Sequence, residues 1–343
     1  MSQSQLSEPA SETDASLNER DIELLRNAPE LYHQICNELG KRIIGQRDAI
    51  RHLFIALMAR GHCLMIGVPG LAKTLLVQSL ADILDLDFQR IQFTPDLMPG
   101  DITGSEILEE GDDGKRYFRF AKGPLFIQLL LADEINRTPP KTQAALLEAM
   151  QEKHITVAGH THQLQAPFFV LATQNPVEQE GTYTLPEAQL DRFMFNLTID
   201  YPSHEEEVEI LLSTTVDRNA TLSKLLDADR ILALQHAVRQ IPVPRSVADY
   251  VVHLVQATRP DHPDSPDFIR RYLQWGAGPR ASQNLALAGK VIAMLDGRFN
   301  VAKEDIIEAA PLVLRHRLLT NFHAEAEGRK VNDLIADLIR HIN

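Results

Sequence analysis

The sequence predicts a doubly wound α/β domain with a parallel five-stranded sheet, followed by a smaller all-helical domain. Five short apolar runs alternate with helical segments between residues 62 and 197. A glycine-containing stretch directly follows the first run. Residues 204–343 show helical periodicity without a convincing strand. A chain of 343 residues is long enough for about two such domains.

The amino-terminal region is expected to lie outside both folded parts. Residues 1–19 are rich in Ser, Glu, Asp and Gln, which predicts a disordered acidic tail. They lack the basic start and apolar core of a signal peptide, and no run in the chain approaches the roughly 18 apolar residues of a membrane span. A helix is predicted over 21–39, with Pro29 as a potential interruption and Gly40 as its end.

The apolar runs are predicted to form a parallel sheet covered on both faces, because several of them are nearly continuous apolar stretches. The five runs are His62–Ile66, Phe88–Phe93, Ile127–Ala132, Phe168–Thr173 and Phe193–Leu197. Helices are expected over 74–84 and 139–150. Thr138 is suited to cap the second of these, which Pro139 and Pro140 open.

The second domain is predicted to begin near residue 204, after Tyr201-Pro202-Ser203. The sequence thus divides into a tail at 1–19, an α/β domain at 20–203 and a helical domain at 204–343. Within the latter, helical periodicity is clear in five stretches. They are residues 227–240, 246–258, 282–296, 304–314 and 331–342.

The net charge indicates which partners to expect, and the cysteines indicate the redox state of the compartment. The formal net charge is −13 without a local basic patch, so nucleic acid is a poor partner. The two cysteines, Cys36 and Cys63, lie in segments that predict reduced thiols inside the fold. A cytoplasmic protein is therefore expected.

The stretch Gly67–Thr74, Gly-Val-Pro-Gly-Leu-Ala-Lys-Thr, lies between a predicted strand and a predicted helix, which is the context of a phosphate-binding loop. Its glycines let backbone N–H groups converge on phosphate oxygens, and the helix adds its positive end. Lys73 is expected to reach the β- and γ-phosphates, and Thr74 to bind Mg²⁺. The alternative is a Gly-Pro-Gly turn that only precedes a helix.

Ala72 occupies a position where such loops usually have glycine. We expect it to lie at the helix start with negative φ, where a methyl group is tolerated.

Two acids end the third predicted strand. Asp133 is expected to hold Mg²⁺ through water, and Glu134 to act as the general base on the attacking water. Ligands of open α/β sheets bind beyond the carboxyl ends of the strands, where both acids lie. Taken alone, an Asp-Glu pair there is more often a solvated strand end.

Three further polar residues follow strands or open helices. Asn175 follows the fourth strand and is placed to orient the lytic water, although without the other motifs a turn before Pro176 is the favoured interpretation. Arg192 directly precedes the last strand and is a candidate arginine finger for a neighbouring subunit. Its alternative is a surface salt bridge with Asp191 or Glu187. Arg280 opens a helix of the second domain and is placed to contact phosphates, or simply solvent.

In this order, these segments resemble the AAA+ superfamily and, within it, the MoxR family. The resemblance runs from about residue 43 to 333 and includes the Ala of the phosphate loop. It rests on Gly67–Thr74 (Walker A), Ala132–Arg137 with Pro139–Gln143 (Walker B), Ala172–Pro176 (sensor 1), Leu185–Phe193 (arginine finger) and Gly278–Ala281 (sensor 2). The family often has Ser where Gly278 stands.

The resemblance implies an ATPase that uses ATP or ADP and Mg²⁺, with Glu134, Asn175, Arg192 and Arg280 as its catalytic residues. The implied nucleotide-contacting residues are Ile44, Gly45, Gly67, Val68, Pro69, Gly70, Leu71, Ala72, Lys73, Thr74, Leu75 and Asp133. Thr74 and Asp133 are also the implied magnesium ligands.

The resemblance further implies a homo-oligomer, a hexameric ring with sites between subunits. Residues 94–119 correspond to the helix-2 insert, and 154–165 to a β-hairpin before sensor 1; both would face the ring's pore. The implied role is chaperone-like remodelling or maturation of a protein client, including metal or cofactor insertion, with a von Willebrand A domain protein as partner.

Three alternatives remain open from the sequence. The core could instead serve a nucleic-acid motor, which the charge disfavours, or a nucleotide-locked scaffold. His154, His160 and His162 could bind a metal if they share a strand face, although a polar hairpin face is the simpler interpretation.

Overall fold

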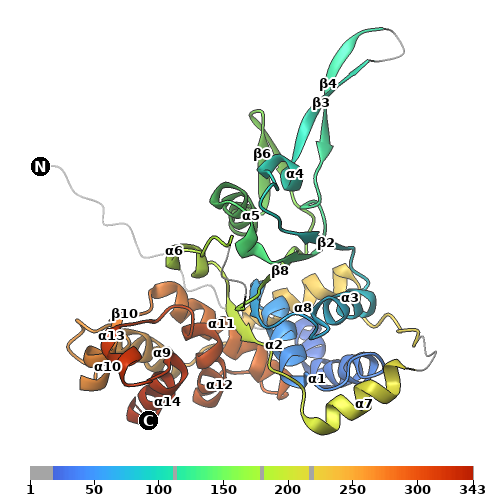
Figure 1. Ribbon diagram of the computed structural model, residues 1–343. Coiled ribbons are helices and arrows are strands. Elements are labelled where there is room, and N and C mark those ends of the chain that lie inside the picture. Colours follow the sequence, from blue (N-terminus) through green and yellow to red (C-terminus); the bar gives the residue numbers. More distant parts are fainter. Residues whose placement is uncertain (1–17, 111–113, 178–180, 216–219, 343) are drawn as a thin grey trace, which may run out of the picture.

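The computed structural model describes residues 18–110, 114–177, 181–215 and 220–342. Its centre is a five-stranded sheet in the order β2-β5-β8-β1-β9, in which every neighbouring pair is parallel (Figure 1). The strands are β1 (Cys63–Ile66), β2 (Phe88–Gln92), β5 (Leu129–Asp133), β8 (Phe169–Gln174) and β9 (Phe195–Thr198). The predicted parallel sheet is confirmed, and each strand lies within two residues of its predicted bounds.

The sheet separates two apolar cores, which explains its continuous apolar strands. On β5, Leu129 and Leu131 face one core, whereas Leu130 and Ala132 face the other. All four side chains are fully buried. A strand at the centre of a sheet covered on both faces has no solvent-facing positions, and so it shows no polar alternation.

Helices cover both faces. The first core includes residues of α1 (Glu19–Leu39), α2 (Arg47–Met58) and α3 (Lys73–Ile83), and the second includes α4 (Pro99–Thr103) and α5 (Pro140–Glu152). The short 3₁₀ helix η1 (Ile135–Arg137) follows β5, and α6 (Glu187–Leu190) precedes β9.

Local details at two of these helices differ from expectation. Helix α1 continues through Pro29 without interruption and ends, as predicted, before Gly40. It begins at Glu19, and residues 1–17 of the predicted tail lie outside the described residues. The predicted cap at Thr138 is wrong: its hydroxyl donates to the Leu97 carbonyl at 3.3 Å, and Pro139 is the residue that precedes α5.

Two hairpins rise from the face covered by α5. The insert consists of α4 followed by the hairpin of β3 (Gly104–Glu110) and β4 (Arg116–Lys122), which projects far from the body (Figure 1). The second hairpin, β6 (His154–Val157) with β7 (His160–Gln163), confirms the predicted hairpin.

The histidines of the second hairpin do not assemble a metal site. In the β6–β7 register His162 faces Ile155 and His160 faces Val157, so His154 points to the opposite face of the hairpin. His162 instead stacks on Phe120 of the insert, with ring centroids 3.9 Å apart. Across the part of the chain that the structure describes, no three His, Cys, Asp or Glu side chains are placed to hold a metal ion.

The carboxyl-terminal part is helical, as predicted, with one correction. Two short segments, β10 (Leu273–Trp275) and β11 (Leu319–Thr320), pair antiparallel, so this domain is not all-helical. Strands of two or three residues are too short to show a period-2 pattern in the sequence. The helices are α7 (His204–Thr214), α8 (Ala228–Gln240), α9 (Arg245–Ala257), α10 (Asp267–Tyr272), α11 (Pro279–Leu295), α12 (Lys303–Leu314), α13 (Phe322–Ala326) and α14 (Val331–Ile342).

The helical part packs against the α1–α2 side of the sheet. A single apolar core runs from Leu25 of α1 and Leu53 of α2 to Leu285 of α11 and Val313 of α12. Figure 1 shows α9 to α14 below the sheet, on the side away from the insert. Among the described helices, none is long and apolar enough to cross a bilayer.

His62 links three elements at the start of β1. Its Nδ1 accepts the Val170 N–H at 3.0 Å, so its Nε2–H donates to the Met150 carbonyl at 3.1 Å. The ring is buried, and this burial lowers the pKa of His62 from 6.5 to about 4. A second proton on the ring would remove the acceptor that Val170 needs.

We therefore expect the free energy of unfolding to fall as the pH drops. Because the unfolded chain binds the His62 proton more readily, the contribution of His62 is complete above pH 6.5. It is lost between pH 6.5 and 4, at a cost of up to about 3 kcal/mol. Urea unfolding at pH 7.5, 6 and 5 measures this loss. His62→Gln should show a shallower loss than the wild type and than the exposed control His33→Gln, and equal slopes in all three proteins would contradict it.

Candidate functional site

The predicted phosphate loop connects β1 to α3. The N–H groups of Val68, Gly70, Leu71 and Ala72 make no hydrogen bonds to the described residues, so they are available to a bound anion. Gly70 has φ +88°, a conformation that favours glycine. These features are what a phosphate-binding backbone requires.

Ala72 corrects the sequence analysis. It has φ +52° and ψ +22°, in the left-handed region, and it immediately precedes α3. The expected negative φ is therefore wrong, because the chain turns into the helix through this residue. A left-handed Ala costs about 1 kcal/mol relative to Gly at the same position.

Lys73 is the first residue of α3. Its ammonium donates to the carbonyls of Gly67 at 2.5 Å and Val68 at 3.3 Å, so the side chain folds back over the loop. Burial lowers the pKa of Lys73, and the carboxylates of Asp133 and Glu134 oppose that shift. The Lys73 ammonium thus lies over the loop whose N–H groups are free, and the carboxylates of Asp133 and Glu134 are close enough to affect its pKa.

The two acids meet Thr173 at the carboxyl edge of the sheet. Ala132 of β5 pairs with Ala172 of β8, so the next residues on the two strands, Asp133 and Thr173, lie side by side. The Thr173 hydroxyl donates to Asp133 Oδ1 at 2.5 Å. The same hydroxyl accepts the Glu134 N–H at 2.9 Å. On its other oxygen, Asp133 accepts Arg90 Nη2 at 2.6 Å. Neither Thr173 nor Arg90 was predicted, since neither stands out from its strand in the sequence.

Glu134 is held by its neighbours. It has φ +56°, and its Oε2 accepts Gln92 Nε2 at 2.6 Å and Arg137 Nη1 at 2.9 Å. Gln92 ends β2 and pairs in register with Asp133, which explains how it reaches the acid. Two donors on one carboxylate oxygen hold the side chain in place.

Asn175 follows β8 at the same edge and is buried. Its Oδ1 accepts the Val177 N–H at 3.1 Å, so it forms the turn that the simpler interpretation expects. A role in orienting water stays a prediction.

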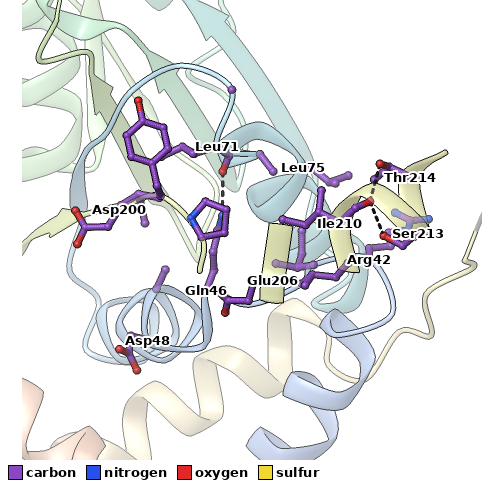
Figure 2. Close-up of a pocket in the computed structure, with 18 of the residues that line it drawn as sticks. Arg42, Gln46, Asp48, Leu71, Leu75, Asp200, Glu206, Ile210, Ser213 and Thr214 are labelled. Atoms are coloured by element: carbon purple, nitrogen blue, oxygen red, sulfur yellow. Dashed lines mark hydrogen bonds between the residues drawn. The ribbon is translucent and has the colours of Figure 1, made fainter. Parts of the chain in front are cut away.

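A pocket of about 320 Å³ adjoins the loop, as Figure 2 shows. Ile44 and Leu75 line it, together with Gly70, Leu71 and Ala72 of the loop, so a nucleotide contact of these residues stays a prediction. Gly45 does not line this pocket.

Gly45 instead gives the Glu206 carboxylate room, because a Cβ at this position would lie 2.3 Å from it.

Gln46 lines the pocket, and its side-chain amide donates to the Leu71 carbonyl at 3.0 Å. The wall opposite comes from the chain after β9 and from α7, including Tyr201 and Ile210. This wall could not be predicted from the sequence, because residues 204–214 are expected to belong to the helical domain.

The two predicted arginines lie elsewhere. Arg192 is the second residue after the end of α6 at Leu190. Its guanidinium makes no hydrogen bond or ion pair with the described residues. The alternative of a salt bridge to Asp191 is therefore not observed, because Asp191 accepts Arg280 Nη1 at 2.9 Å and Arg317 Nε at 2.7 Å. Figure 1 shows α6 well separated from α3. The structure thus holds Arg280 at Asp191, the residue before Arg192, and neither arginine lines the pocket that adjoins the loop.

Comparisons with known proteins match this geometry. A model of the ATPase family associated with various cellular activities (AAA) matches residues 62–195, and a model of the AAA lid domain matches 268–338. The chaperone MoxR1 of Mycobacterium tuberculosis is 42% identical over 290 residues, which cover 84% of this chain and 76% of MoxR1. The chain belongs to the MoxR family of AAA+ ATPases.

Other MoxR-type relatives extend the likeness over the same region. The protein MoxR of Methylorubrum extorquens is 32% identical, with 89% of this chain and 91% of that protein covered. The uncharacterised protein YeaC of Bacillus subtilis is 43% identical over 88% of this chain and 91% of its own length. A crystal structure of a candidate ATPase from Cytophaga hutchinsonii has a TM-score of 0.86 at 41% identity, covering 95% of this chain and 97% of the other. This MoxR-family chain is therefore a nucleotide-binding ATPase with an AAA core and an AAA lid.

Proposed function

We propose that this ATPase works as a ring-shaped homo-oligomer, a hexamer by family resemblance, in which each nucleotide site is completed by arginines of the neighbouring subunit. The observation that carries this proposal is the place of two arginines apart from the chain's own Lys73: Arg280 pairs with Asp191, and Arg192, the next residue along the chain, makes no ion pair with the described residues. A guanidinium without an ion-pair partner among the described residues is suited to an anion that the same subunit does not supply.

Within one subunit, the free N–H groups of Val68, Gly70, Leu71 and Ala72 and the Lys73 ammonium would bind the phosphates, while the pocket beside the loop would hold the base. The Thr74 hydroxyl and the Asp133 carboxylate suit Mg²⁺, which prefers oxygen ligands and would neutralise phosphate charge. Asp133 already lies among the charges around Lys73, so these residues fit the ion.

Glu134 would take the proton of the attacking water, since its carboxyl group lies at the same edge of the sheet as Asp133. Asn175 would orient that water. Arg192 and Arg280 would then stabilise the charge that develops on the transferring phosphoryl group of the neighbour.

The contact between Gln92 and Glu134 gives a testable consequence. The hydrogen bond from Gln92 Nε2 restrains the Glu134 carboxylate in its present position. Removing about 1 kcal/mol of such restraint should raise the basal ATPase rate of Gln92→Ala by about fivefold. Gln89→Ala, an exposed residue of the same strand, should leave the rate unchanged. A rate at or below wild type in Gln92→Ala would show that this contact does not restrain the reaction.

The proposed work of the ring is chaperone-like remodelling or maturation of a protein client, with a von Willebrand A domain protein as partner, in the cytoplasm. The insert supports a client contact, because its projecting hairpin exposes Leu108, Tyr117 and Phe118. Steady-state ATPase rates with a candidate client, with DNA and with neither test this role. Stimulation by protein supports it. Stimulation by DNA alone would indicate a nucleic-acid motor, and a rate near zero under all conditions would indicate a nucleotide-locked scaffold.

A further inference from the structure

Arg317 is a buried arginine outside the predicted motifs. It follows α12 in the lid, and its side chain is only 2% exposed. Its Nε donates to Asp191 Oδ1 at 2.7 Å, and its Nη1 donates to the Val313 carbonyl at 2.5 Å and to the Met194 carbonyl at 3.3 Å. Burial lowers the pKa of this guanidinium, and the Asp191 carboxylate opposes that shift.

The remaining donors of Arg317 hold the backbone on both sides of Arg192. Its Nη2 donates to the Asp191 carbonyl at 2.9 Å and to the Phe193 carbonyl at 2.7 Å. The peptide that carries Arg192 is thus fixed at its preceding and following residues by one planar group. A guanidinium that uses its whole donor set in this way permits little movement of the segment.

Asp191 extends the same contact to Arg280. One carboxylate oxygen accepts Arg317 and the other accepts Arg280 Nη1, so the core segment binds two lid arginines at once. The neighbouring His316 ring is buried beside Arg317, and burial lowers the pKa of His316 well below its usual value. His316 therefore adds no positive charge, and Asp191 is the counter-ion that allows these guanidinium groups to lie close together.

We infer that Arg317 and Asp191 are positioning residues that hold Arg192 and Arg280 at one fixed spacing toward the neighbouring subunit's nucleotide. This inference rests on the proposed shared site. Arg317 itself touches no nucleotide; it acts through the backbone of Arg192 and through Asp191. The competing explanation is that the buried contacts only stabilise the junction of core and lid.

Arg317→Lys separates these explanations. Lysine keeps the charge but cannot reproduce the fork of donors, so the Arg192 segment should lose its fixed position. We expect kcat to fall about 10- to 100-fold, whereas the subunit's own affinity for ATP stays unchanged. Arg298→Lys is the matched control: Arg298 is a lid arginine paired with the buried Asp305, far from Arg192 in the chain. It should keep its kcat even where its melting temperature drops as much as that of Arg317→Lys.

The ATPase rate of a mixed assembly distinguishes positioning from a purely structural role. In a one-to-one mixture with Glu134→Gln, some Arg317→Lys subunits have a Glu134→Gln neighbour. The pocket of such an Arg317→Lys subunit is intact and its neighbour's arginines are well positioned, so turnover should recover. Asp191→Asn should behave in the same way with a smaller defect, and it serves as the second variant if Arg317→Lys does not fold.

Three results overturn the inference. If Arg317→Lys keeps a wild-type kcat, or if its mixture stays inactive while a mixture of Arg192→Ala with Glu134→Gln recovers, then Arg317 does not position the finger. If the Arg192→Ala mixture also stays inactive, the shared site itself is wrong, and the inference falls with it.

Discussion

Glu134→Gln is expected to bind ATP with near wild-type affinity and to hydrolyse it about 10²- to 10⁴-fold more slowly. The amide has the size of the carboxylate and can still accept the hydrogen bonds from Gln92 and Arg137, so the fold around it should persist. It cannot accept a proton from water at neutral pH. The loss should therefore appear in kcat and not in binding.

Calorimetric titration with ATP and a steady-state phosphate-release assay measure these two quantities separately. Glu304→Gln, an exposed acid at the start of α12, is the matched control and should behave like the wild type. Hydrolysis by Glu134→Gln within about twofold of wild type would remove Glu134 as the general base.

Arg192→Ala is expected to keep its own ATP affinity and to lose about 10³- to 10⁵-fold in turnover, the range that arginine fingers contribute in related phosphoryl transfers. Because the guanidinium has no ion-pair partner among the described residues, its removal leaves no buried charge uncompensated. The melting temperature should therefore change little, which distinguishes this loss from unfolding.

The control for Arg192→Ala is Arg245→Ala, an arginine with an 89% exposed side chain paired with Asp249. It should keep full turnover. If Arg192→Ala hydrolyses ATP normally, or if it loses ATP binding together with turnover, the finger assignment is wrong.

The sheet could be predicted from the sequence because its strands carry a strong signal. Fully apolar stretches such as Leu129–Ala132 fit a strand buried on both faces, and the polar residues that end β5 and β8 mark the edge where ligands bind. Gly67–Thr74 was recognisable because strand, loop and helix follow one another in the expected order.

The rest depends on contacts between distant segments. The backbone at Ala72 could not be predicted, because a side chain type does not determine φ where tertiary packing sets the direction of the chain. Nor could the sequence show that Asp191 pairs with Arg280 and Arg317, which lie 89 and 126 positions away. The strands Leu273–Trp275 and Leu319–Thr320 were missed for a different reason, since they are too short to show a pattern.

The most direct test of a site shared between subunits is the ATPase rate of a mixture of Arg192→Ala and Glu134→Gln. Each variant alone should be nearly inactive, because one lacks the arginine and the other lacks the base. In random one-to-one rings, about a quarter of the interfaces combine an intact pocket with an intact arginine, so about a quarter of the wild-type rate should return. If the two variants assemble together and bind ATP but the mixture stays as inactive as its components, the site is not completed by a neighbouring subunit's Arg192.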